Sequence, residues 1–131
     1  MKIAGLHHAM LTVCDLDRSS NFYGGVMGLE TFRTIPDDGV AGAKVIFSLP
    51  DGNYFGIVQH ARGDESRFDE MRTGLDHISF TVTAEELPAW QKRFGAAGIS
   101  SSEPAPAASG EMVIIVRDPD NIQVQIFGRR P

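Results

Sequence analysis

Apolar residues alternate with polar ones in two stretches of the chain, residues 8–13 and 77–82. Alternation with a period of two is typical of a strand with one buried face. In both stretches the polar face begins with a histidine, His8 or His77, and a threonine follows four residues later. Further apolar patterns predict the other strands, over residues 30–34, 43–49, 54–59, 111–117 and 122–127.

A helix is predicted after each of these two opening strands. In the second helix Thr83 and Glu86 form a capping-box pair, and apolar residues follow at spacings of three and four until Gly98. The first helix is expected to be capped by Asp15 or Asp17. A Gly-Gly pair inside it costs about 1 kcal/mol per glycine relative to alanine, so the first helix is predicted to be the less stable one.

The same order of elements occurs twice, with a constant offset of 69 residues. His8 matches His77, and the turn that begins at Pro50 matches the turn that begins at Pro119. Equal offsets at both ends of a half indicate two equal modules. The predicted fold class is therefore α+β, with two tandem βαβββ modules that form a curved, partly open mixed sheet with a concave ligand cavity.

One domain over residues 1–131 is expected, because 131 residues with 42% hydrophobic composition suffice for one core. The first module is placed at about 5–60, a charged linker at 61–73 and the second module at about 74–128. Residues 100–110, rich in Ser, Pro and Ala, are predicted to form a loop. This loop and the linker are both candidates for a lid.

Charge and composition exclude several classes of partner. The net charge is −5 and no basic stripe is present, so a nucleic-acid partner is not expected. No apolar stretch approaches the roughly 18 to 20 residues of a membrane-spanning helix, and no signal segment is recognised, so a cytoplasmic location without a membrane partner is predicted. The single Cys14 is expected to be a small buried apolar residue.

The polar face of the opening strands is the predicted site. It lies opposite the helices, and a concave polar sheet face is where a small ligand can be held. Gly56 and Gln125 are partners at the offset of 69 residues, one in each closing strand. Alternation adds further residues to these two faces: Tyr54, Val58 and His60 in the first copy, and Gln123 and Phe127 in the second.

Two motifs and the repeat together resemble a known superfamily. The pattern His-x-x-x-Thr-Val-x-Asp-Leu-x-x-Ser-x-x-Phe-Tyr-x-x-x-x-Gly-Leu runs from His8 to Leu29, and Asp118-Pro119-Asp120 lies near the end. This resembles the glyoxalase, bleomycin-resistance and extradiol dioxygenase superfamily, also called vicinal oxygen chelate proteins. The resemblance covers essentially the whole chain and implies a small-molecule ligand or substrate. It also implies a homodimer, since an open sheet leaves unpaired edges that a second copy can cover.

The resemblance further implies a divalent metal (Fe, Mn, Ni, Co or Zn), held by one residue from the opening strand and one from the closing strand of each module. His8 and His77 match the family's histidine positions, while Gly56 and Gln125 fall where carboxylates are common. The expected metal ligands are therefore His8, His77 and Gln125, whose amide oxygen can coordinate. His60 is a candidate replacement for the missing ligand.

Two functions remain open at this stage. In the first, the chain is a metal-dependent lyase, isomerase or dioxygenase that binds two adjacent oxygens of its substrate. A true glyoxalase reaction is not expected, because Gly56 stands where a glutamate would move a proton; His60 is the candidate catalytic base. In the second, the chain is a metal-free protein that sequesters a small aromatic or antibiotic-like compound. The predicted ligand contacts in either case are Tyr54, Gly56, Gln123 and Phe127.

Overall fold

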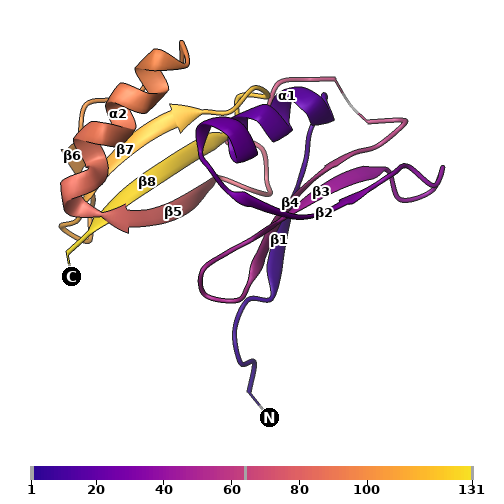
Figure 1. The fold of residues 1–131 in the computed structure, drawn as a ribbon, viewed down its shortest axis with the longest axis horizontal. Helices are drawn as coiled ribbons and strands as arrows, with labels where there is room; N and C mark the ends of the chain where they lie inside the picture. The colour runs from indigo at the N-terminus through magenta and orange to yellow at the C-terminus, as the bar shows by residue number, and fades with distance from the viewer. Residues whose placement is uncertain (1, 64, 131) are drawn as a thin grey trace. The chain divides into compact units, whose positions relative to one another are not determined.

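The structure is a computed structural model that describes residues 2–63 and 65–130. The chain divides into two compact units, Met1–Glu65 and Ser66–Pro131. Each unit contains one four-stranded mixed sheet with a helical segment against one of its faces (Figure 1). The predicted α+β class with a repeated βαβββ module is confirmed.

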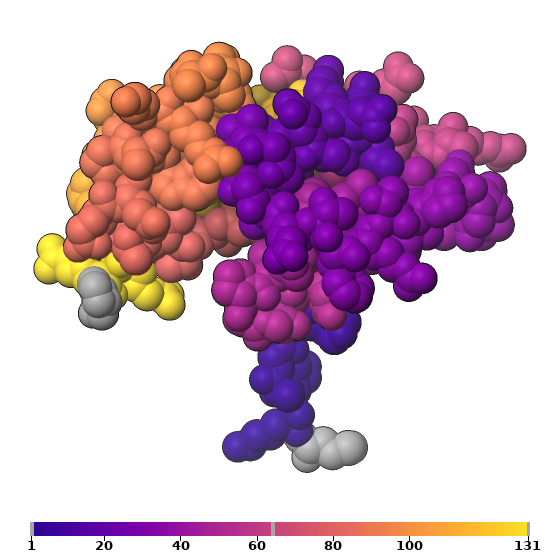
Figure 2. Space-filling view, viewed as in Figure 1, coloured from indigo at the N-terminus to yellow at the C-terminus, as the bar shows by residue number. Residues whose placement is uncertain are grey.

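The first unit has the sheet order β1-β4-β3-β2. β1 and β4 run parallel, whereas β4 pairs with β3 and β3 with β2 in antiparallel fashion. Residues 2–7 precede this sheet as an exposed segment without regular secondary structure, seen as an indigo column in Figure 2. The elements are β1 (His8–Thr12), α1 (Leu16–Ser20), the π-helix η1 (Asn21–Val26), β2 (Glu30–Ile35), β3 (Ala43–Ser48) and β4 (Tyr54–Gln59).

The second unit repeats this topology in the order β5-β8-β7-β6. β5 and β8 are parallel, and the other neighbours are antiparallel. Among the described residues, no helix is long and apolar enough to cross a membrane. The elements are β5 (His77–Thr83), the 3₁₀-helix η2 (Ala84–Glu86), α2 (Leu87–Ala96), β6 (Ala105–Pro106), β7 (Met112–Arg117) and β8 (Gln123–Arg129).

Aromatic side chains fill the core of the first unit. Tyr23 from η1 packs on Phe55 of β4 with the ring centroids 4.9 Å apart, and Phe47 of β3 stacks on Phe55 at 6.2 Å. All three are fully buried. Because Tyr54 and Gly56 flank Phe55 along β4, their side of the strand is the sheet face that points away from the helical segment. In the first unit, the sheet face that carries Tyr54 and Gly56 therefore lies opposite the helical segment, as the alternation predicted.

The helix caps follow the sequence prediction. Asp15 is the N-cap of α1, and its Oδ1 accepts from the backbone N–H of Arg18 at 2.9 Å. Thr83 and Glu86 form the capping box, in which Glu86 Oε2 accepts from the backbone N–H and the hydroxyl of Thr83 at 2.9 Å each. The chain therefore enters both helices at the predicted residues.

The first helix departs from a regular α-helix where the two glycines lie. Asn21–Val26 forms a π-helix that contains both Gly24 and Gly25. A Cβ atom on Gly24 would lie 3.3 Å from Cε1 of Phe47, so this turn approaches the sheet closely. The low helix propensity of the glycines is thus accompanied by tight packing, which an alanine would disturb.

One prediction about a connection needs correction. The expected loop at 100–110 contains the short strand Ala105–Pro106, and Ser101 forms an isolated bridge with Val116. The boundary between the two compact units, after Glu65, falls within the segment 61–73 that was expected to join the modules. A strand of two residues is too short to show alternation, and the Ser, Pro and Ala content of residues 100–110 is typical of a loop. The sequence therefore contains no indication of the strand Ala105–Pro106.

Candidate functional site

β5 and β8 bring the predicted residues of the second unit onto one face. His77 lies beside Gln123, and Ser79 lies beside Gln125. The hydroxyl of Ser79 donates to Oε1 of Gln125 at 3.4 Å. His77 and Gln125 are therefore diagonal neighbours on adjacent strands, with both side chains on the same side of the sheet.

The imidazole of His77 is oriented by the residue before it. Nδ1 of His77 lies 2.5 Å from Oδ1 of Asp76, and the His77 side chain is 38% exposed. An Nδ1–H that donates to a carboxylate leaves Nε2 as the acceptor of the ring. Metal-binding histidines are commonly held in this way. Asp76 contacts a candidate site residue and was not predicted from the sequence, although its place immediately before His77 could have indicated it.

His8 has a different neighbour in the first unit. Its Nδ1 lies 2.9 Å from Nδ1 of His7, and the two rings meet edge to face with centroids 5.1 Å apart. One of these nitrogens donates and the other accepts, so this contact uses Nδ1 and leaves Nε2 of His8 for a further partner. Nε2 of His8 can therefore bind a metal only in the tautomer in which its Nδ1–H donates to His7.

Met10 fills the space where the first unit would carry an acidic ligand. Met10 lies beside Gly56 in the parallel β1–β4 pair. A Cβ atom on Gly56 would lie 2.3 Å from Sδ of Met10. The thioether therefore covers the Cα atom of Gly56, and this position of the first unit offers a metal no oxygen donor.

His60 lies away from His8 along the strand direction. His8 pairs with Tyr54 at the start of β4, whereas His60 follows the last residue of β4. Six residues of strand correspond to about 20 Å. His60 instead lines a pocket of about 260 Å³ that also includes Cys14 and Asp37. The structure does not bring His60 to His8, and a role for His60 as a base remains a prediction.

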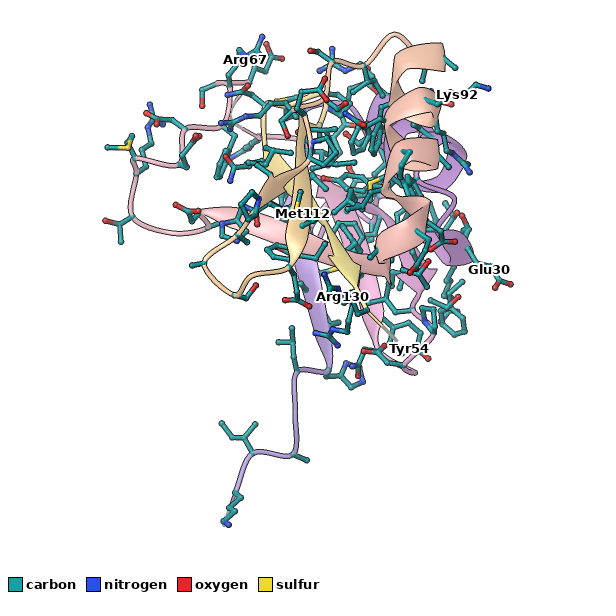
Figure 3. The ribbon with its side chains drawn as sticks, turned by 90° about the vertical axis from the view of Figure 1, so that its left-hand side faces the viewer. Glu30, Tyr54, Arg67, Lys92, Met112 and Arg130 are labelled. Carbon is teal, nitrogen blue, oxygen red and sulfur yellow. The ribbon has the colours of Figure 1, made fainter. Side chains whose placement is uncertain are left out.

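A second pocket, of about 380 Å³, opens on the sheet face of the first unit that lies opposite the helical segment. Tyr54, a predicted ligand contact, belongs to this pocket and is labelled in Figure 3. Its volume lies within the roughly 300–1,000 Å³ that small-molecule sites occupy. The residues that line it are His7, His8, Met10, Phe32, Lys44, Ile46 and Tyr54.

Gln123 and Phe127 lie on the same face of β8 as Gln125, and Phe127 is half-buried. Gln123 is already engaged, because its Oε1 accepts from Nη2 of Arg117 at 3.3 Å. The same guanidinium holds Glu70 through two hydrogen bonds, Nη2 to Oε1 at 2.6 Å and Nη1 to Oε2 at 3.0 Å. These bonds lower the pKa of Glu70 to about 2 and raise the pKa of Arg117. No sequence pattern pointed to this pair.

The donor types agree with a divalent metal only in part. Two imidazole nitrogens, of His8 and His77, suit most first-row divalent metals. The third predicted donor is the neutral amide oxygen of Gln125. No group of three or more His, Cys, Asp or Glu side chains able to hold a metal occurs within residues 2–63 and 65–130. As donor types, two imidazoles and an amide oxygen bind a divalent metal more weakly than a set that includes a carboxylate.

Comparison with known proteins identifies the family. The family model named Glyoxalase/Bleomycin resistance protein/Dioxygenase superfamily matches residues 5–126. The chain therefore belongs to this superfamily, as its motifs and its repeat indicated.

Two curated relatives are lactoylglutathione lyases by name. One from Arabidopsis thaliana is 28% identical over 128 residues, which are 95% of this chain and 44% of the relative. A putative one from Brassica oleracea var. gemmifera is 27% identical over the same shares. The chain thus spans less than half the length of the curated relatives it matches.

Solved structures of superfamily members resemble this fold over nearly the whole chain. A glyoxylase/bleomycin resistance protein/dioxygenase domain from Frankia sp. EAN1pec has a TM-score of 0.85 and 29% identity, with 98% of this chain and 94% of that chain covered. A mutant of the fosfomycin resistance protein FosX from Listeria monocytogenes, complexed with Mn(II) and 1S,2S-dihydroxypropylphosphonic acid, has a TM-score of 0.76 and 25% identity, covering 97% and 93%.

Proposed function

We propose that this chain is a divalent-metal-dependent enzyme acting on a small substrate with two adjacent oxygens. In this proposal His8, His77 and Gln125 hold the metal. The observation that supports it most is the contact of Asp76 with Nδ1 of His77, which leaves Nε2 as the ring's acceptor. A bound divalent metal would supply Lewis acidity toward the substrate oxygens.

The reaction class that we propose is lyase, isomerase or dioxygenase chemistry other than that of glyoxalase I. The curated relatives are named as lactoylglutathione lyases, but this chain carries Gly56, covered by Met10, where a carboxylate base would stand. A proton must then be moved by another group. His60, the base suggested by the sequence, lies about 20 Å from His8 along the strand direction, beyond the hydrogen-bond reach that proton transfer from a substrate at His8 requires. The metal itself is proposed to be one of Fe, Mn, Ni, Co or Zn.

A second candidate function is metal-free sequestration of a small apolar compound. The apolar pocket of the first unit and the missing carboxylate favour it. The orientation of His77 by Asp76 favours the enzyme, because a sequestering protein has no need of a fixed imidazole. We therefore place the enzyme first.

We also propose that the protein is a cytoplasmic homodimer. β1 and β2 are the outer strands of the first sheet, and β5 and β6 are the outer strands of the second. An outer strand presents backbone groups that a second copy can pair. Sedimentation at micromolar concentration tests this; a species of monomer mass alone would contradict it.

The metal content of the purified protein tests the enzyme proposal. Protein made without a metal-chelating tag should hold about one equivalent of a divalent metal by elemental analysis. His8→Ala and His77→Ala should each lose it, and the matched control His60→Ala should keep it. A metal-free wild type that takes up none of the five metals when they are offered would contradict the enzyme and favour sequestration.

A further inference from the structure

The sheet face that carries His8 in the first unit and the face that carries His77 in the second unit have different residues at equivalent positions. The pair Met10–Gly56 in the first sheet corresponds to the pair Ser79–Gln125 in the second, in the same parallel register. Tyr54, which pairs with His8, corresponds in the same way to Gln123. The face that is polar in the second unit is therefore aromatic and apolar in the first.

An irregularity in β2 adds a further ring to the first face. The pairing of β2 with β3 shifts between Thr31 and Arg33, and Phe32 is the additional residue. Such bulges redirect a side chain, often next to a site. Phe32 lines the pocket and is 58% exposed. Its ring centroid lies 5.0 Å from that of Tyr54, and the ring centroid of Tyr54 lies 5.8 Å from that of His7. These three rings form one wall.

Lys44 supplies a positive charge at a defined place in the same pocket. It pairs with Val58, four residues along β4 from Tyr54, which is the partner of His8. Four residues of strand correspond to about 13 Å. Met10 and Ile46 line the pocket between these two levels. The Lys44 ammonium donates to the backbone oxygen of Gly42 at 3.1 Å and has further N–H donors for a ligand.

We propose that this pocket selects organic acids in which an apolar group, aromatic or branched, separates a carboxylate from the reacting oxygens. The carboxylate binds Lys44, the apolar group lies over Met10 and Ile46 against the ring of Phe32, and the oxygens extend toward His8. The orientation of the substrate, with its reacting oxygens toward His8, rests on the function proposed above. The binding of the acid itself requires no metal. The cation and the apolar lining together favour such an acid over a purely apolar ligand.

The test measures binding of 3-phenylpropionate and its neutral amide to the full chain by calorimetry, with and without MnCl₂. We expect Lys44→Met to weaken binding of the acid about tenfold and to leave the amide unchanged. The control Lys92→Met removes a charge from the exposed surface of α2 and should change neither. Met10→Ser, which installs the residue of the second unit, should weaken both ligands.

Several outcomes would overturn the inference. Equal loss in Lys44→Met and Lys92→Met would show that the lysine makes no specific contact, and no binding of the acid by the wild type would show that the pocket does not take this class. If Phe32→Ser changed the sedimentation of the protein but not its affinity for the acid, the pocket would be an interface between copies. Binding of the acid without any metal uptake would keep this inference and refute the enzyme.

Discussion

The thioether of Met10 covers Gly56 in the first unit, at the place that corresponds to Ser79 and Gln125 in the second unit. The two halves of the chain therefore offer different donors at equivalent positions. One half retains a histidine and an amide oxygen, and the other retains a histidine alone. This difference leads directly to a prediction about metal affinity.

We predict that adding a carboxylate at residue 56 strengthens metal binding. The φ angle of Gly56 is one that other residues can adopt. A Cβ atom there would lie 2.3 Å from Met10 Sδ and 3.2 Å from the Val45 carbonyl oxygen. The variant Gly56→Glu is therefore combined with Met10→Ala to make room. Because a charged ligand is added, its Mn(II) affinity should rise at least about tenfold.

The matched control for this experiment is Gly56→Gln with Met10→Ala, which has the same shape and no charge. Calorimetric titration with MnCl₂ compares the two double variants with the wild type. Equal affinities in all three proteins would contradict the assignment of residue 56 to the metal site. Loss of folding in the Glu variant, detected by circular dichroism, would be shared by the Gln variant if sterics rather than charge were the cause.

Asp76 should matter through His77. We predict that Asp76→Asn lowers metal affinity by about 10- to 100-fold, because the amide no longer holds the Nδ1–H of His77 as an anion does. Asp69→Asn is the control, since Asp69 lies in the same connecting segment and pairs with Arg72 at 3.9 Å. Competition with a fluorescent chelator measures both variants. An unchanged affinity in Asp76→Asn would leave its contact with His77 without a role in metal binding.

The Glu70–Arg117 pair should make stability depend on acid pH. The pKa of Glu70 is lowered in the folded chain to about 2 from 4.5, so its carboxylate stabilises the fold above pH 4.5. This contribution declines as the pH falls from about 4.5 toward 2. We expect Glu70→Gln to melt below the wild type at pH 6 and to approach it near pH 2.

Thermal unfolding at a series of pH values measures this difference. Glu85→Gln, at an exposed position of η2, is the control and should follow the wild type at every pH. A difference between Glu70→Gln and the wild type that stays constant from pH 6 to pH 2 would show that the carboxylate's ionisation does not stabilise the fold.

The sequence predicted the elements that have a clear periodic pattern and missed those that do not. Alternation located β1 and β5, and the offset of 69 residues located the corresponding positions Gly56 and Gln125. Alternation is a local property of the sequence, and the offset can be recognised because two copies share it. The strand Ala105–Pro106 is too short to alternate, and the π-helix at Asn21–Val26 depends on how closely its glycines approach the sheet.

The candidate site residues were named from the sequence, but their side-chain contacts were not. His8, His77 and Gln125 were inferred from register and resemblance. The place of Asp76 immediately before His77 could have indicated their contact. The ion pair between Glu70 and Arg117 joins a connecting segment to the end of β7, 47 residues apart, and leaves no period in the sequence.

The most direct test of the proposed site is titration with Mn(II) followed by NMR. A paramagnetic ion broadens the signals of nuclei close to it, so the ring protons of His8 and His77 and the side-chain amide of Gln125 should broaden together at substoichiometric metal. The ring protons of His60 should stay sharp. Broadening at His60 alone, or at only one of the three proposed ligands, would contradict a metal site formed by His8, His77 and Gln125.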